Sequence, residues 1–209
     1  MDLISDSFAD GSPIPGEFAF GLPDAEAHVT FGPNRNPHLR WTEPPAGAQS
    51  FVLICHDPDV PTKPDDVNQE GREVPSDLPR TDFFHWVVVD LPADLREIAA
   101  GAFADGVVPR GQDVASGPHG CRQGSNDYTG WFAGDADMEG EYLGYDGPCP
   151  PWNDSLLHHY VFTLYALAVS RVDVAGSFTG AAAREAIADH VLAEASITGT
   201  YTLNPRLGS

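Results

Sequence analysis

Basic side chains are scarce in this sequence. Lys63 is the only lysine, and 11 basic residues stand against 31 acidic ones, which gives a formal net charge of −20 at pH 7. An acidic surface repels the phosphate backbone of nucleic acids and anionic membranes, so neither is expected as a partner. A small anionic ligand would need hydrogen-bond donors arranged locally against this field.

Long apolar runs are also missing. No stretch approaches the roughly 20 apolar residues that cross a bilayer, so no stable membrane insertion is expected. The first residues, MDLISDSFADG, carry two early acids and no basic region, which does not fit a secretory signal. We therefore expect a cytoplasmic protein.

Cysteine is rare, with only Cys55, Cys121 and Cys149 in the chain. An odd number of cysteines without an export signal predicts reduced thiols. A pair between Cys121 and Cys149 stays open. Known catalytic signatures are missing as well, because the sequence holds no G-x-S-x-G, no H-E-x-x-H and no G-x-x-x-x-G-K-S/T.

Glycine and proline, by contrast, are abundant, with 21 and 19 residues in a chain that is 42% hydrophobic. This composition favours short strands joined by shaped turns, in one mainly β domain over residues 1–209. Apolar runs predict buried strands at 51–55, 83–92 and 157–169. Residues 62–82 form a polar, Pro-broken loop, and TGAAAREAIADHVLAEA (179–195), capped by Thr179, is the one predicted helix.

Polar side chains lie at the ends of these strands. Asp57 and Asp59 follow the first strand in DPDVP, and the prolines restrict their backbone. His85 lies in FFHWVVVDLP, where alternation predicts one face for Phe83, His85, Val87 and Val89. His158 and Tyr160 share a face of the last strand, after the stiff segment GPCPPW at 147–152. Each feature alone also fits ordinary packing or turn formation, but together they predict one pocket.

These motifs, in their order, resemble a known family. DPDVP, FFHWVVVDLPAD, RQGSNDY, GPCPP and HHYVFTLYAL follow one another as in the phosphatidylethanolamine-binding protein (PEBP) family, and the bacterial and archaeal Raf-kinase-inhibitor-like branch is the most similar. The similarity runs from Phe8 to Tyr201. It implies a PEBP-like β-sandwich, in which a large antiparallel sheet packs on a smaller one, with a C-terminal α-helix.

The resemblance also implies a pocket for phosphate, acetate or a phospholipid headgroup. We expect His85 and His158 to donate hydrogen bonds to the anion together with Tyr160, and Asp57 to orient an imidazole. No cofactor and no metal is implied, while a homodimer and a regulated protein partner are left open. Carried over by motif, the ligand-binding residues are Asp57, Asp59, His85, Gly147, Pro150, Pro151, His158 and Tyr160.

Two alternatives to a binding module remain. Asp57, His85 and His158 have the composition of a two-histidine, one-carboxylate metal site, or could act as acid and base in a phosphoester hydrolase. A structural protein with a pocket that has lost its use is a further option. The chain also departs from the family in having His159 where arginine is usual, and in longer segments at 62–82 and 129–145, which we expect to reshape the pocket entrance.

Overall fold

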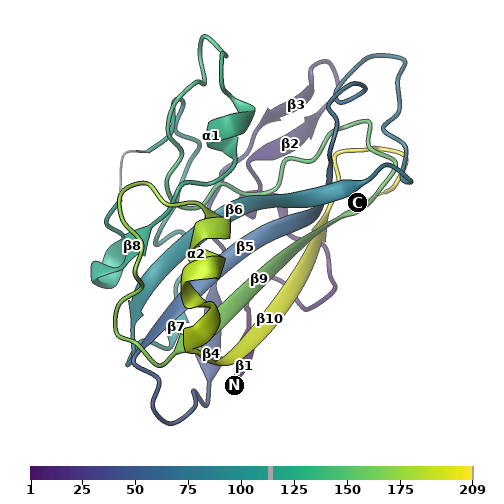
Figure 1. Cartoon of the computed structure of the whole chain (residues 1–209). Coiled ribbons are helices and arrows are strands. Elements are labelled where there is room, and N and C mark those ends of the chain that lie inside the picture. The colour runs from purple at the N-terminus through teal and green to yellow at the C-terminus, as the bar shows by residue number, and fades with distance from the viewer. Residues whose placement is uncertain (113–114, 209) are drawn as a thin grey trace.

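The computed structural model describes residues 1–112 and 115–208 and is mainly β (Figure 1). Its centre is a five-stranded antiparallel sheet with the strand order β10-β9-β5-β6-β8. Its strands are β5 (Ser50–Pro61), β6 (Arg80–Pro92), β8 (Arg122–Gln123), β9 (His158–Leu167) and β10 (Val191–Tyr201). The predicted strands at 51–55, 83–92 and 157–169 are the three central strands, and β5 continues through the DPDVP motif.

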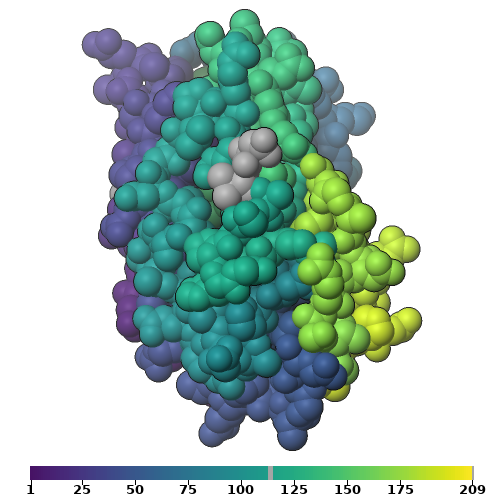
Figure 2. Space-filling model, turned by 90° about the vertical axis from the view of Figure 1, so that its left-hand side faces the viewer, coloured from purple at the N-terminus to yellow at the C-terminus, as the bar shows by residue number. Residues whose placement is uncertain are grey.

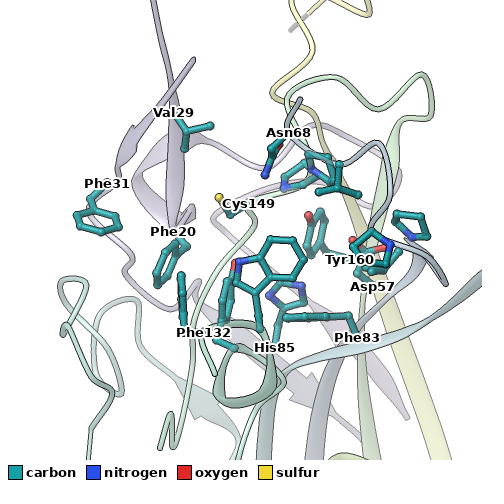
Figure 3. A pocket seen from close by; sticks show the side chains of 18 of the residues that line it. Phe20, Val29, Phe31, Asp57, Asn68, Phe83, His85, Phe132, Cys149 and Tyr160 are labelled. Carbon is teal, nitrogen blue, oxygen red and sulfur yellow. The ribbon is translucent and has the colours of Figure 1, made fainter. Parts of the chain in front are cut away.

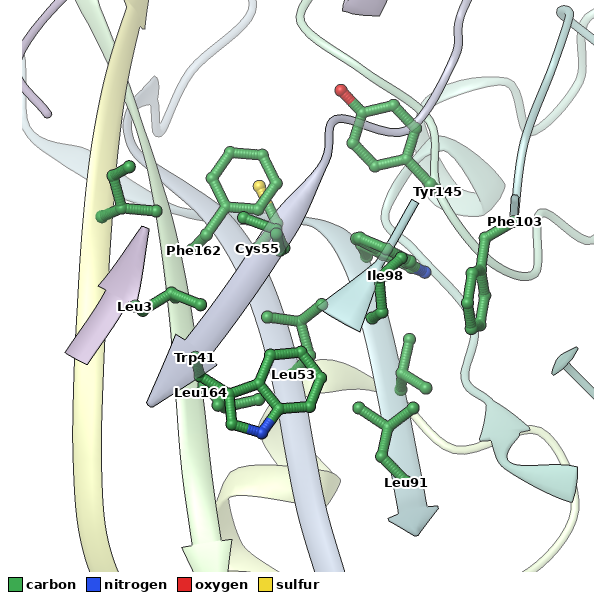
Figure 4. Packing of buried hydrophobic residues seen from close by; sticks show 14 of the residues in the cluster. Leu3, Trp41, Leu53, Cys55, Leu91, Ile98, Phe103, Tyr145, Phe162 and Leu164 are labelled. Carbon is green, nitrogen blue, oxygen red and sulfur yellow. The ribbon is translucent and has the colours of Figure 1, made fainter. Parts of the chain in front are cut away.

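A smaller sheet packs on one face of the large one. It is formed by β1 (Asp2–Ile4), β4 (Leu39–Thr42) and β7 (Glu97–Ile98). The core between the two sheets includes Leu3, Trp41 and Ile98 from the small sheet and Leu53 and Leu164 from the large one (Figure 4). The predicted fold class, a large antiparallel sheet packed on a smaller one, is confirmed.

The remaining elements are short. A hairpin of β2 (Gly21–Asp24) and β3 (His28–Phe31) stands apart from both sheets. Single turns of helix are η1 (Gly16–Phe18), η2 (Pro118–Gly120), α1 (Tyr128–Trp131) and η3 (Ala188–His190). Figure 2 shows that the described residues between β7 and β9, in teal and green, cover one side of the molecule between the N-terminal segments in purple and the C-terminal ones in yellow-green.

The C-terminal helix α2 (Gly180–Ile187) covers the other face of the large sheet (Figure 1). The Thr179 side chain accepts a hydrogen bond from the Ala182 N–H, so the predicted N-cap is present. The helix is shorter than the predicted 179–195, because the chain becomes β10 at Val191. Along β10 half-buried and exposed residues alternate, and pairing with β9 outweighs the local helical pattern.

The predicted faces of β6 are wrong beyond His85. Cys55 pairs with Trp86 and His56 pairs with Phe84, so the ladder skips His85 at a β-bulge. Trp86 therefore faces the core between the sheets, and Val87 packs with the residues beneath α2. The bulge leaves His85 on the side of the small sheet, where its ring lies 5.0 Å from the Tyr160 ring.

Two further expectations concern the thiols and membrane insertion. Cys55, Cys121 and Cys149 are all free, so the open Cys121–Cys149 pair is not formed. Over the ranges that the structure describes, no helix has the length and apolar character needed to cross a bilayer.

Candidate functional site

A pocket of about 640 Å³ opens beyond the end of the central strands, between the β2–β3 hairpin, the loop after β5 and α1 (Figure 3). At its inner end lies a group that we call the pocket floor: Asp57, His85 and Tyr160. These come from β5, β6 and β9, which are neighbours in the sheet, and each side chain is at most 3% exposed. The sequence predicted that these three residues would meet.

His158 lies behind the pocket floor and does not line the pocket. Its Nδ1 is 2.6 Å from Oδ2 of Asp57, its Nε2 is 3.1 Å from Oδ2 of Asp154, and the ring is completely buried. Burial alone would lower the pKa of His158, but the two carboxylates raise it to about 9. The ring is therefore a cation at pH 7, with both nitrogens occupied, and it positions Asp57 rather than facing a ligand.

Asp154 belongs to this network and was missed by the sequence analysis. Arg80 donates to both of its carboxylate oxygens, at 2.6 and 3.1 Å. Burial would raise the pKa of Asp154, but His158 and Arg80 hold it below its ordinary value. The network contains two carboxylates and two cations, so the negative charge of Asp57 is balanced from behind. No motif marks Asp154, because only the folded chain brings it to His158 and Arg80.

The His85 ring is held in one tautomer. Nδ1 lies 2.8 Å from the carbonyl oxygen of Asp146, to which it donates. Burial lowers the pKa of His85 to about 4, so the ring is neutral at pH 7. Nδ1 carries the proton, and Nε2, which makes no hydrogen bond within the described part of the chain, is an acceptor. This differs from the expectation, based on the sequence, that His85 donates a hydrogen bond to the ligand.

Tyr160 supplies a hydrogen-bond donor to the pocket floor. Its hydroxyl is buried and has no hydrogen-bond partner among the described residues. Burial raises its pKa well above the ordinary value, so the hydroxyl keeps its proton. A buried hydroxyl without a partner is costly unless a ligand or water supplies one.

Asp59 lies outside the pocket. Its carboxylate accepts from the backbone N–H of His159 and lies 2.8 Å from that residue's Nδ1, on the exposed side of β9. Its own N–H donates to Oδ1 of Asp57 at 2.7 Å. Asp59 therefore helps to orient Asp57 through its backbone, and His159 is a surface residue.

Of the three residues predicted for the pocket rim, two line the pocket and one does not. Pro150 and Pro151 line the pocket, whereas Gly147 lies behind it. The Gly147 N–H donates to Asn34, and its carbonyl accepts from the Tyr128 hydroxyl. A Cβ at Gly147 would lie 2.0 Å from the Phe18 carbonyl oxygen, so only glycine fits.

Both long segments that depart from the family contribute to the pocket wall. The loop after β5 supplies Pro64, Val67 and Asn68, and the segment 129–145 supplies Trp131 and Phe132. Asn68, which the sequence analysis missed, donates its backbone N–H to Asn153 and accepts through Oδ1 from the Trp152 N–H. Its amide nitrogen points toward the pocket (Figure 3).

The described residues contain no group of three His, Cys, Asp or Glu side chains arranged to hold a metal ion. In the predicted Asp57, His85 and His158 set, the ring nitrogens of His158 are already bonded to carboxylates. The residues present therefore do not fit a two-histidine, one-carboxylate site.

Comparisons with known proteins agree with this architecture. A family model described as phosphatidylethanolamine-binding protein matches residues 4–202. The chain is 34% identical over 202 residues to the UPF0098 protein YbhB of Escherichia coli K12, which covers 97% of this chain and 100% of that protein. It is 30% identical over 201 residues to a Mycobacterium tuberculosis protein named as lipoprotein LppC, covering 96% of this chain and 72% of that one.

Solved structures are similar too. Escherichia coli YbcL, described as a new member of the mammalian PEBP family, matches with a TM-score of 0.69 and 27% identity, over 96% of this chain and 97% of that chain. A PEBP homologue from Chlamydia trachomatis, CT736, matches with a TM-score of 0.62 and 28% identity, over 96% and 95% of the two chains.

Proposed function

Because this chain belongs to the phosphatidylethanolamine-binding protein family, we propose that its pocket binds a phosphomonoester group, either of a small soluble compound or of a phospholipid headgroup of the phosphatidic acid type. The observation that carries the proposal is the Tyr160 hydroxyl, a buried donor without a partner at the pocket floor. A phosphate oxygen would accept this hydrogen bond.

The remaining floor groups favour a phosphate that still carries one proton. Asp57 is an acceptor, and the neutral His85 ring presents the lone pair of Nε2. A phosphate monoanion can donate its P–O–H to Nε2 while its other oxygens accept from Tyr160 and from the Asn68 amide. The buried His158 cation reduces the repulsion between Asp57 and an incoming anion.

Phosphoester hydrolysis is less well supported than binding. A general base works best when its pKa lies near the operating pH, and the pKa of His85 is lowered to about 4. His158 is the more basic ring, but both of its nitrogens are hydrogen-bonded to carboxylates, so neither is free to accept a proton from a substrate. A regulated protein partner, a homodimer and a cytoplasmic location stay predictions.

Isothermal titration calorimetry with inorganic phosphate and phosphoethanolamine tests the proposal. We expect saturable binding, and at least about a ten-fold loss of affinity in Tyr160→Phe, because a hydrogen bond to a charged group contributes about 1.5–3 kcal/mol. Tyr165→Phe is the matched control, since Tyr165 packs on the opposite face of β9. The proposal fails if neither compound binds, or if both variants bind as the wild type does.

A further inference from the structure

The pocket is polar at one end and apolar at the other. Figure 3 shows Asp57 and Tyr160 at one end, and Val29 and Phe31 of the β2–β3 hairpin at the other. Besides the pocket floor, the lining includes the apolar side chains of Phe20, Val29, Phe31, Trp131 and Phe132, with Thr30 and Asn68 among its polar residues. A phosphate group fills only the inner end of such a cavity.

A continuous row of rings joins the two ends. The Tyr160 ring lies 5.0 Å from His85, and His85 lies 5.5 Å from Tyr128. Tyr128 stacks on Phe20 at 4.5 Å, and Phe20 meets Phe31 edge-on at 5.7 Å. We call these five side chains the aromatic row. It offers apolar contact from the pocket floor to the entrance.

Two of the large aromatic side chains that line the pocket remain exposed. Phe31 is 56% exposed and Trp131 is 47% exposed, although both line the pocket. Neither contributes much to the core, so their apolar surface is available to a ligand. The hairpin that carries Phe31 is joined to the facing wall by His28, whose ring stacks on Trp152 at 3.9 Å.

We infer that the natural ligand is a phosphomonoester with a single apolar chain or ring system, which lies along the aromatic row while its phosphate occupies the pocket floor. The inference rests on the proposed function and narrows the class of ligand. Sugar phosphates and nucleotides fit poorly, because beyond the pocket floor, Thr30 and Asn68 apart, their hydroxyl groups would lie mostly against rings and aliphatic side chains. Because the protein carries a net charge of −20, an anionic bilayer repels it, so we expect the ligand to be a monomeric ester in solution.

The test is a calorimetric series at pH 6 with inorganic, ethyl, butyl and hexyl phosphate. Burial of one methylene is worth about three- to four-fold in affinity, so hexyl phosphate should bind at least about ten-fold more tightly than butyl phosphate. Phe31→Ala and Trp131→Ala should flatten this dependence on chain length, so that the ratio of hexyl to inorganic phosphate affinity falls in both variants. Leu192→Ala removes a similarly exposed apolar side chain on β10, outside the pocket, and should leave this ratio unchanged.

Tyr160→Phe separates this inference from the proposed function. It should weaken every member of the series by the same factor and leave the dependence on chain length intact. If no member binds, the proposed function itself fails. If inorganic and hexyl phosphate bind equally well, the inference of an apolar substituent is wrong, whereas the proposed binding of phosphate stands. Binding to phosphatidylcholine vesicles containing phosphatidic acid, without binding of hexyl phosphate, would overturn the monomeric single-chain ligand.

Discussion

Nδ1 of His158 lies 2.6 Å from the carboxylate of Asp57, so a buried imidazolium stands directly behind the pocket floor. The pair reduces the negative charge that Asp57 presents to the pocket. It also gives His158 a role that can be measured without any ligand, because removal of the cation leaves both Asp57 and Asp154 without their shared partner.

Substitution of this histidine should destabilise the protein strongly. In His158→Asn, two buried carboxylates lose a charged partner, and we expect the free energy of unfolding to fall by about 3–5 kcal/mol. His159→Asn is the control, since that ring is largely exposed and should change stability by about 0.5 kcal/mol or less. Urea denaturation at pH 7 measures both. A loss below about 1 kcal/mol for His158→Asn would show that the network does not hold this site together.

Stability should decrease on the alkaline side of neutrality. The pKa of His158 is raised to about 9 in the folded protein, against about 6.5 for a free histidine. The folded state therefore keeps a proton that the unfolded state loses, so this contribution is complete below pH 6.5 and is lost as the pH rises through 9. Denaturation curves between pH 6.5 and 9 should show the decline in the wild type and not in His158→Asn.

The affinity for a phosphomonoester should fall as the pH rises. Because Nε2 of His85 is an acceptor, the bound form is the monoanion, and the second pKa of such esters is about 6. Affinity should drop by up to about ten-fold per pH unit above that value. In His85→Gln the amide can donate to the dianion, so the profile should flatten. Calorimetry from pH 5 to 8 measures both, and a flat wild-type profile would contradict the assigned tautomer.

Gly147→Ala should disturb the support of the pocket. The added methyl would lie 2.0 Å from the Phe18 carbonyl oxygen and 2.9 Å from the Tyr145 hydroxyl, so the backbone must shift, at a cost of about 1–3 kcal/mol. Gly130→Ala in α1 is the control, because its Cβ would meet nothing within 4 Å. Thermal unfolding of the two variants distinguishes them, and equal melting temperatures would show that Gly147 is not constrained.

Local sequence determined the central strands, the Thr179 cap and the meeting of Asp57, His85 and Tyr160. Apolar runs of strand length have few other ways to be buried, and polar groups at the ends of adjacent strands then come together. The bounds of α2 were not predicted, because pairing between β9 and β10 outweighs the helical pattern after Ile187.

Tertiary structure alone decided how the pocket is charged and what surrounds it. The bulge at His85, the Asp146 carbonyl that fixes its tautomer and the Asp154–Arg80 pair behind His158 all join residues far apart in the chain. The sequence does not distinguish a histidine that burial makes neutral, such as His85, from one that two carboxylates keep charged, such as His158. That difference depends on desolvation and on partners within a few ångströms, which only the folded chain provides.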